Sequence, residues 1–262
     1  MPLTLPSVDP RPLRSPPLAV VVFQVRFEQN LRISDGTTGL MVHERLGGRT
    51  GRYPRIEPQQ VITSQFEINP AAGAQSPPTS VPMRGWRMRS EDSGWVVTLM
   101  PDTASLETTS YTTWRKDFQG RILELLTALA EHVNPQIEER VGLRYVNKVI
   151  KPGAVGLSDF RDVIAPGLLG PAGDTFWADG IQNAQQLIEV TVENEIEAKI
   201  RHGGLRDNRG KLEGYLLDND FYRAEPQSFD VSRITSLADR LNNAAAAIFQ
   251  QSLHSDFLET LY

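Results

Sequence analysis

The chain has 262 residues, of which 40% are hydrophobic and 23% are charged, and its formal net charge is −5. This composition is typical of a globular protein with a sizeable core, and it excludes a chain that is disordered throughout. The absence of cysteine excludes disulfides, thiolate catalysis and cysteine-ligated metal centres. Residues 1–133 carry 14 basic and 13 acidic side chains and residues 134–262 carry 13 and 19, so neither half has the strong basic excess that is usual in nucleic-acid-binding domains.

The first 17 residues are rich in proline. Proline has a fixed φ and no backbone N–H, so this segment cannot form a regular helix, and we predict an extended chain along the surface. The prolines are Pro2, Pro6, Pro10, Pro12, Pro16 and Pro17. The apolar run that follows, Leu18–Phe23, is too short for a signal peptide or a membrane helix. We therefore expect a cytoplasmic protein with no membrane-embedded segment.

Residues 18–133 are predicted to form an N-terminal α+β half. Apolar and polar residues alternate within Leu18–Glu28, which indicates a half-buried strand. Thr38–Leu46 is predicted as a short helix that ends at two glycines, and an apolar stripe at helical spacing predicts a long helix over Thr113–Val133. Between these helices we predict strands at Val61–Ile68, Trp86–Ser90, Trp95–Met100 and Ser105–Thr109, with a Pro/Ala/Ser-rich loop over residues 69–82.

Residues 134–262 are predicted to form a C-terminal α+β half. It begins with a strand at Arg140–Ile150 and a short helix near Ser158–Ile164. The strict alternation over Leu187–Arg201 allows either one long strand or a hairpin with the three-residue loop Glu193-Asn194-Glu195, which would pair Val190 with Ala198. A strand at Lys211–Leu217 and a long helix from about Val231 complete this half.

The order of predicted elements in the two halves is similar. A strand, a short helix, several antiparallel strands and a long helix occur in residues 18–133 and again in residues 134–262. We therefore predict an α+β fold in which an antiparallel sheet carries both long helices on one face. In this interpretation the halves are two pseudo-repeated β-α-β-β-β-α units that pack as one unit.

One short motif has the residue types of a metal–phosphate site. Glu195, Glu197 and Lys199 have the spacing Glu-x-Glu-x-Lys, which in a strand places two carboxylates and an ammonium group on one face. Enzymes that hold a metal–triphosphate use such a pattern, although near the N-terminus and inside a basic barrel. A solvated strand face with cross-strand ion pairs explains the same residues.

A second group of charged residues surrounds the glycine-rich loop at residues 47–51. Arg45, Arg49, Arg52 and Arg55 could form a basic patch for phosphates, although the loop lacks the spacing of a phosphate-binding loop and fits a helix-ending turn equally. The four histidines, His43, His132, His202 and His254, have no metal-ligand spacing, and we predict neither a metal site nor a cofactor.

Several blocks of sequence resemble those of a sporadically distributed prokaryotic family of conserved hypothetical proteins of about this length. The blocks are Pro16-Pro17, Val22–Phe27, Tyr53-Pro54, Trp86, Tyr111–Trp114 with Phe118, Arg140–Asn147, and Leu241-Asn242 with Phe249. The most specific of them is Arg-x-Gly-Leu-Arg-Tyr-x-Asn at Arg140–Asn147. The family has no assigned activity, and its patchy distribution implies mobile genes such as defence or toxin–antitoxin neighbourhoods. This chain departs from the pattern at Asn242, where a histidine is expected.

The block at Arg140–Asn147 contributes two candidate binding residues, Arg144 and Asn147. They differ in parity, so a regular strand would direct them to opposite faces of the sheet. One can then contact a partner while the other satisfies buried backbone groups, and a purely structural role for both explains the residues as well.

No complete catalytic constellation is found in the sequence. We therefore expect a non-enzymatic binding or accessory protein that engages a protein partner, with no catalytic residues assigned. The first alternative is a nucleic-acid or nucleotide-binding protein that uses the basic loop of Arg45, Arg49, Arg52 and Arg55. The second is a metal-dependent phosphate-ester enzyme that uses Glu195, Glu197 and Lys199.

Overall fold

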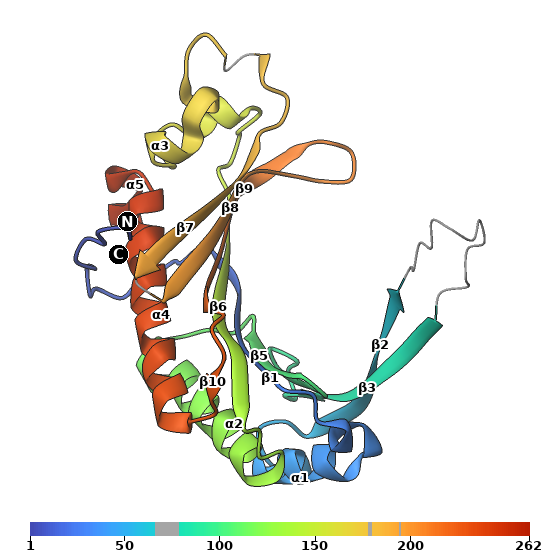
Figure 1. Cartoon of the computed structure of the whole chain (residues 1–262). Helices are drawn as coiled ribbons and strands as arrows, with labels where there is room; N and C mark the ends of the chain where they lie inside the picture. The colour runs from blue at the N-terminus through green and yellow to red at the C-terminus, as the bar shows by residue number, and fades with distance from the viewer. Residues whose placement is uncertain (66–78, 178–179, 194) are drawn as a thin grey trace, which may run out of the picture.

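All ten strands of the computed structural model belong to one antiparallel sheet (Figure 1), in the order β2-β3-β4-β5-β1-β6-β9-β8-β7, with β10 paired to one end of β6. The structure describes residues 1–65, 79–177, 180–193 and 195–262. The strands are β1 (Leu18–Phe27), β2 (Arg55–Gln65), β3 (Thr79–Arg89), β4 (Trp95–Met100), β5 (Thr103–Thr108), β6 (Ile137–Val149), β7 (Gln185–Glu193), β8 (Ile196–Arg206), β9 (Leu212–Arg223) and β10 (Gln227–Ser228). The predicted α+β class with an antiparallel sheet is thus confirmed.

The helices are α1 (Thr37–Arg45), α2 (Gln119–His132), α3 (Pro166–Leu169), α4 (Val231–Ser252) and α5 (Ser255–Leu261). The helix predicted over Thr113–Val133 is divided, because the turn at Trp114–Phe118 is wider than an α-helical turn and α2 begins only after it. The predicted helix near Ser158–Ile164 is a single 3-10 turn at Leu157–Phe160. Helix α4 begins at the predicted place because the Asp230 carboxylate accepts the Arg233 N–H at 2.7 Å.

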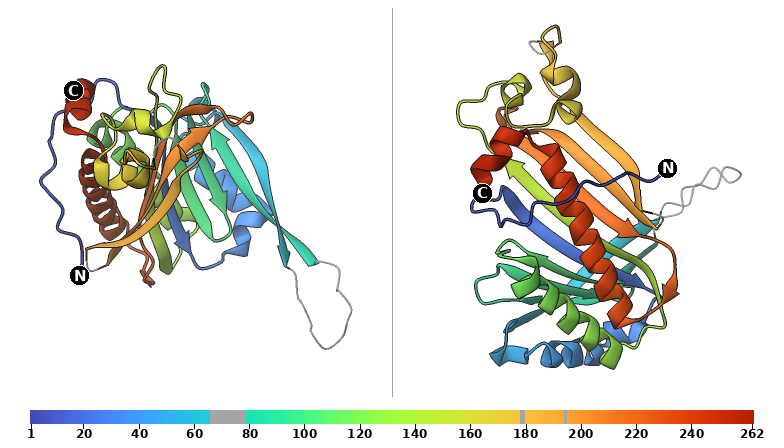
Figure 2. Two further views of the ribbon diagram at one scale, coloured as in Figure 1. Left: turned by 90° about the horizontal axis from the view of Figure 1, so that it is seen from above. Right: turned by 90° about the vertical axis from the view of Figure 1, so that its left-hand side faces the viewer.

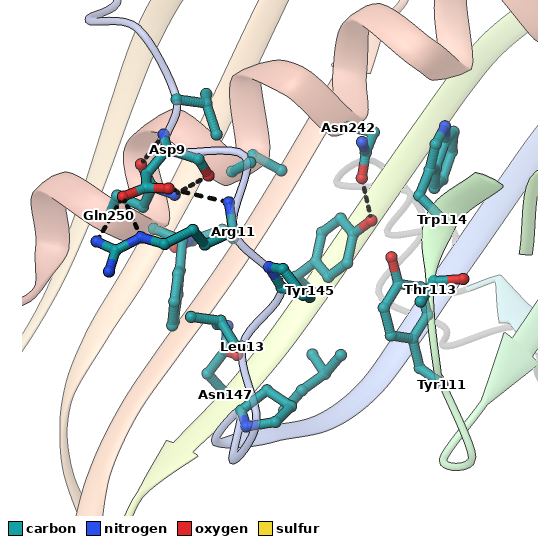
Figure 3. Close-up of a pocket in the computed structure, with 18 of the residues that line it drawn as sticks. Asp9, Arg11, Leu13, Tyr111, Thr113, Trp114, Tyr145, Asn147, Asn242 and Gln250 are labelled. Atoms are coloured by element: carbon teal, nitrogen blue, oxygen red, sulfur yellow. Dashed lines mark hydrogen bonds and ion pairs between the residues drawn. The ribbon is translucent and has the colours of Figure 1, made fainter. Parts of the chain in front are cut away.

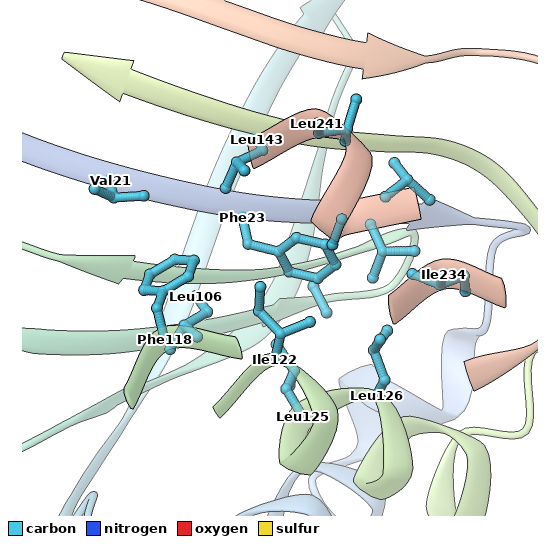
Figure 4. Packing of buried hydrophobic residues seen from close by; sticks show 14 of the residues in the cluster. Val21, Phe23, Leu106, Phe118, Ile122, Leu125, Leu126, Leu143, Ile234 and Leu241 are labelled. Atoms are coloured by element: carbon cyan, nitrogen blue, oxygen red, sulfur yellow. The ribbon is translucent and has the colours of Figure 1, made fainter. Parts of the chain in front are cut away.

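Helices α2 and α4 lie on one face of the sheet, as predicted (Figure 2). The odd-numbered positions of β1 supply fully buried side chains, among them Phe23, which packs between the apolar stripes of the two helices (Figure 4). The stripes are Phe118, Ile122, Leu125, Leu126 and Leu129 before and along α2, and Ile234, Leu237 and Leu241 along α4. The alternation in β1 and the helical spacing in α2 and α4 therefore identify the same buried layer.

The strands of the two halves lie on opposite sides of the central β1–β6 pair. Strands β2 and β3 turn away to the right of the view in Figure 1, on the side opposite α4. Of the two alternatives for Leu187–Arg201, the structure has the hairpin, and it pairs Val190 with Ala198 as expected. The predicted three-residue loop Glu193-Asn194-Glu195 is wrong, because a register shift between Thr191 and Glu193 keeps Glu193 in β7, opposite Ile196. Asn194 and residues 69–78 of the predicted loop over residues 69–82 lie outside the described residues, and the loop prediction is wrong for residues 79–82, which belong to β3.

The N-terminal segment, residues 1–17, contains no helix or strand and crosses α4 on its outer side (Figure 2). The Leu3 N–H donates to the Thr191 carbonyl of β7 at 2.9 Å, and the Asp9 N–H donates to Gln250 Oε1 of α4 at 3.0 Å. Near the end of the segment, the Arg14 N–H donates to the Leu261 carbonyl of α5 at 2.7 Å. The segment therefore joins the edge of the sheet to the two C-terminal helices.

None of the helices in the described ranges is long and apolar enough to span a lipid bilayer.

Substitution by alanine is expected to change the stability of the protein in opposite directions at two helical glycines, Gly39 and Gly120. A Cβ at Gly39 of α1 would overlap the indole ring of Trp86, whereas a Cβ at Gly120 of α2 would meet no atom within 4 Å. We expect Gly120→Ala to raise the free energy of unfolding by about 0.5–1 kcal/mol, because alanine favours the helix. Gly39→Ala should lower it by about 1–3 kcal/mol, because the overlap displaces Trp86. Urea denaturation of both variants measures the two values, and stabilisation by Gly39→Ala would contradict the packing of Trp86 on α1.

Candidate functional site

Arg144 of β6 lies on the face of the sheet opposite α2 and α4. Its guanidinium group donates two parallel hydrogen bonds to the Asp218 carboxylate of β9, at 2.6 and 2.7 Å. Asp218 is also 3.8 Å from Arg201 of β8. The hydrogen bond with Asp218 raises the pKa of Arg144 above its usual value. Because the Asp218 side chain is only 7% exposed while that of Arg144 is 46% exposed, the carboxylate holds the guanidinium group at the surface in one orientation.

Further cross-strand pairs continue this pattern. Arg140 donates to both oxygens of Asp220 at 2.8 and 3.0 Å and lies 4.6 Å from the ring centre of Tyr222. Lys199 of β8 is 2.9 Å from Glu189 of β7. The register places these side chains on one face, because even positions of β6 and β9 align with odd positions of β7 and β8. We call this surface the open face, defined by Arg140, Arg144, Glu189, Lys199, Arg201, Asp218, Asp220 and Tyr222.

Asn147 lies on the other side of β6, toward the helices, so the structure places the two candidate residues of this strand on opposite faces. Its side chain is 4% exposed and lines a cavity of about 300 Å³. The walls come from α4, the core-facing positions of β6 and β9, residues 111–114, and the N-terminal segment (Figure 3). The cavity is thus built from parts of the chain that are far apart in the sequence.

A hydrogen bond between β6 and α4 crosses the cavity wall. The Tyr145 hydroxyl donates to Asn242 Oδ1 at 2.7 Å (Figure 3). Burial raises the pKa of Tyr145 well above its usual value, so the hydroxyl stays protonated and acts as the donor. The Tyr111 ring meets the Tyr145 ring nearly edge-on, with 6.2 Å between the ring centres. The tyrosine thereby fixes which way the Asn242 carboxamide is turned.

Two buried polar atoms of the cavity have no hydrogen-bond partner within the described part of the chain. Asn219, next to Tyr145 in the register of β6 and β9, is 1% exposed, and its Oδ1 accepts no hydrogen bond. The Thr113 hydroxyl is likewise buried without a partner there. At the mouth, Arg11 pairs with Asp9 at 2.7 Å and with Glu259 at 2.8 Å. The charged groups of the cavity are therefore paired at its mouth, and the free groups inside are neutral.

The basic loop does not assemble into one cluster. Arg45 pairs with Glu131 at 2.7 Å and Arg52 with Glu124 at 2.9 Å, both carboxylates of α2. Arg49 is exposed in the turn at Gly48–Thr50, and Arg55 begins β2, opposite Arg89 in the register. Two of the four cations are therefore already paired, and the other two lie on different elements.

The Glu-x-Glu-x-Lys residues are not gathered on one face either. Glu195 lies before β8 begins, and it pairs with Arg240 of α4 on the helix side of the sheet. Glu197 and Lys199 lie on the opposite face, where Lys199 is paired with Glu189. The physical reason is that Glu195 belongs to the irregular connection between β7 and β8, where the alternation of a strand does not apply.

The histidines are also dispersed. His43 is buried and its Nε2 is 2.7 Å from the Tyr53 carbonyl, whereas His202 is buried beside the Tyr215 hydroxyl at 2.9 Å. Burial lowers the pKa of His202. Across the ranges that the structure describes, no three His, Asp or Glu side chains are grouped so that they could hold a metal ion.

No binding role was predicted from the sequence for Tyr145, Asn219 or Asn242, all three of which line the cavity. A signal was present for Tyr145, because it shares the parity of the core-facing Val141 and Leu143, and a polar side chain on an apolar face is unusual. Asn242 follows directly after Leu241 of the buried stripe of α4. The pairing register of β6 and β9, which places Asn219 beside Tyr145, could not be inferred from the sequence.

Together these features define an α+β protein whose single antiparallel sheet has a helix-bearing face with a polar cavity and an open face with fixed ion pairs. No family model, curated protein or solved structure matches the chain. The resemblance to the sporadically distributed family therefore stays a prediction.

Proposed function

We propose that this protein is a non-enzymatic binding protein that engages a protein partner through the open face. The observation that carries the proposal is the orientation of its charges: side chains from four neighbouring strands are held by cross-strand pairs with one another, notably Arg144 and Arg201 around Asp218. None of the described helices packs over this face (Figure 1). Charges that are held in place before binding lose little side-chain entropy on association.

The arrangement of these charges favours a protein over a nucleic acid. A phosphate backbone is bound by cations that are free to contact it, and each carboxylate nearby repels it. On the open face Arg140, Arg144 and Lys199 each contact a carboxylate, so the face presents both signs in a fixed pattern. We infer a partner surface of complementary mixed charge, since such patterns confer specificity in protein–protein interfaces.

A charge exchange within one pair tests this proposal. Lys199→Glu combined with Glu189→Lys keeps the net charge and the cross-strand pair but reverses the pattern that a partner meets. Both side chains are about half exposed, so we expect the free energy of unfolding to change by less than about 1 kcal/mol. The tagged protein, purified from its host, should retain a stoichiometric protein companion that the exchanged variant loses.

The matched control exchanges the pair Arg52–Glu124, which joins the basic loop to α2 away from the open face. Arg52→Glu with Glu124→Arg should leave the companion bound. Loss of the companion in this control alone would contradict the proposal. Co-purification of nucleic acid in place of a protein, with binding that weakens steeply as salt is raised, would favour the basic-loop alternative instead.

Cross-linking with an amine-reactive reagent gives an independent location of the contact. Lys148 and Lys199 lie on the open-face side of the sheet, whereas Lys116 is exposed in the turn before α2 on the helix-bearing face. We expect the companion to cross-link to Lys148 or Lys199. A companion that cross-links only to Lys116 would place the interface on the wrong face.

We also propose that the two halves are pseudo-repeats of one β-α-β-β-β-α unit. Two features support this: the first strands of the halves, β1 and β6, lie side by side at the centre of the sheet, and each half contributes one of the long helices, α2 and α4. The first half departs from the unit, because four strands separate α1 from α2.

A further inference from the structure

We propose that the cavity under the N-terminal segment binds a neutral, planar molecule with a cyclic amide edge, the chemistry of a uracil-type or hypoxanthine-type nucleobase or its nucleoside. This site lies on the helix-bearing face of the sheet, so it is separate from the open face and does not depend on the function proposed above. The cavity volume of about 300 Å³ is at the lower end of the range for small-molecule pockets.

We infer the amide edge of the ligand from a hydrogen-bond donor and an acceptor that are unpaired on the wall of the cavity. Because the Tyr145 hydroxyl donates to Asn242 Oδ1, the Nδ2 group of Asn242 remains as a hydrogen-bond donor. Asn219 supplies the complementary group, a buried Oδ1 without a donor in the described chain. Both asparagines line the cavity. A ligand that offers a carbonyl to Asn242 and an N–H to Asn219 would satisfy both groups, and the edge of a cyclic amide carries both.

The fold fixes the positions of Asn219 and Asn242 through Tyr145. Asn219 and Tyr145 are register partners on β9 and β6, and Tyr145 reaches across to Asn242 of α4. The buried Asn219 Oδ1 destabilises the unliganded protein, because an acceptor removed from water without a donor keeps its desolvation cost. Because buried polar groups are nearly always hydrogen-bonded, a bound ligand that supplies the missing donor explains this exception.

The ligand is expected to be neutral, because the described residues that line the cavity include no unpaired charge. Asp9 and Arg11 pair with each other, and Arg11 also pairs with Glu259. A phosphate or carboxylate on the inner wall would therefore be buried without a counter-charge. The ligand is expected to be planar because three aromatic rings contribute to the lining of the cavity, those of Tyr111, Trp114 and Phe249.

Calorimetric titration of the full chain with uridine, thymidine and inosine tests the proposal. We expect at least one of these nucleosides to bind with a Kd below 1 mM. Methylation of the amide N–H, as in 3-methyluridine when uridine binds, should weaken binding at least tenfold, because Asn219 is again left without a donor. UMP should bind no more tightly than uridine.

Two adjacent asparagines of α4 supply matched variants. Asn242→Asp replaces the Nδ2 donor by an acceptor and should lower the affinity at least tenfold. Asn243→Asp makes the same change at an exposed position outside the cavity and should leave the affinity within twofold. Thermal melting checks that both variants fold. The proposal is overturned if no nucleoside of the set, nor uracil or hypoxanthine, binds below 1 mM, if Asn242→Asp binds as well as Asn243→Asp, or if UMP binds more tightly than uridine.

Discussion

We expect Glu138→Gln to lower the free energy of unfolding by about 3–5 kcal/mol. Glu138 of β6 is 0% exposed and its carboxylate pairs with Arg223 of β9, which is 2% exposed. Arg233 of α4 lies 3.5 Å from the same carboxylate. Burial already lowers the pKa of Arg223, and glutamine would leave its guanidinium group with only the more distant Glu195 carboxylate, at 3.9 Å, as a counter-charge. Urea denaturation followed by circular dichroism measures the loss.

The neighbouring residue supplies the control for this prediction. Glu139 is exposed and lies 3.9 Å from Arg26, so Glu139→Gln should change the free energy of unfolding by less than about 1 kcal/mol. Replacing both members of the buried pair, with Glu138→Leu and Arg223→Met, should recover most of the lost stability, because neither buried charge of the pair remains and Arg233 is partly exposed. Equal losses for Glu138→Gln and Glu139→Gln would show that the pair is open to solvent.

Phe23→Ala should destabilise the whole chain by about 3–5 kcal/mol. Phe23 is 0% exposed in the central strand β1, and its ring packs between α2 of the first half and α4 of the second (Figure 4). If the halves pack as one unit, the variant should still unfold in a single transition at lower urea concentration. Tryptophan fluorescence reports mainly on residues 18–133, which hold three of the four tryptophans, and far-UV circular dichroism reports on the whole chain.

The comparison for Phe23→Ala is a smaller truncation on the opposite face of the same strand, β1. Val22 lies on the helix-free face and is half-buried, so Val22→Ala should cost less than about 1.5 kcal/mol. Coincident transitions by the two probes in Phe23→Ala would support one cooperative unit. Separate transitions, with only the fluorescence change shifted, would show that the two halves unfold independently.

The elements with strong periodicity could be predicted from the sequence. The alternation in Leu18–Phe27 and the stripes of α2 and α4 depend on neighbours a few residues apart, and the structure confirms each of them. Strand order depends on contacts between distant segments, so the position of β9 between β6 and β8 was not predictable from local pattern. The start of β2 at Arg55, six residues before the predicted start, was hidden because Pro58 and the polar residues beside it do not look like a strand.

For the candidate sites, too, local pattern was predictable and contacts between distant segments were not. Opposite parity was enough to predict that Arg144 and Asn147 face different sides of the sheet. Their surroundings were not predictable, because Asp218 is 74 residues from Arg144 and Asn242 is 97 residues from Tyr145. The metal–phosphate interpretation of the Glu-x-Glu-x-Lys motif needs Glu195 on a strand face, but Glu195 lies in the connection before β8, where the hairpin alternative had placed it.

The two edge strands of the sheet, β7 and β2, limit how a strand of another chain can pair with it. An unpaired edge strand can accept a strand from another molecule, which leads to uncontrolled association. At β7, the Thr191 carbonyl is already occupied by the Leu3 N–H of the N-terminal segment. At the other edge, Pro58 interrupts β2 between the charged Glu57 and the polar Gln59, and proline cannot donate to a further strand. Growth of the sheet is thus disfavoured at both rims, which leaves its faces as the surfaces on which another molecule can bind.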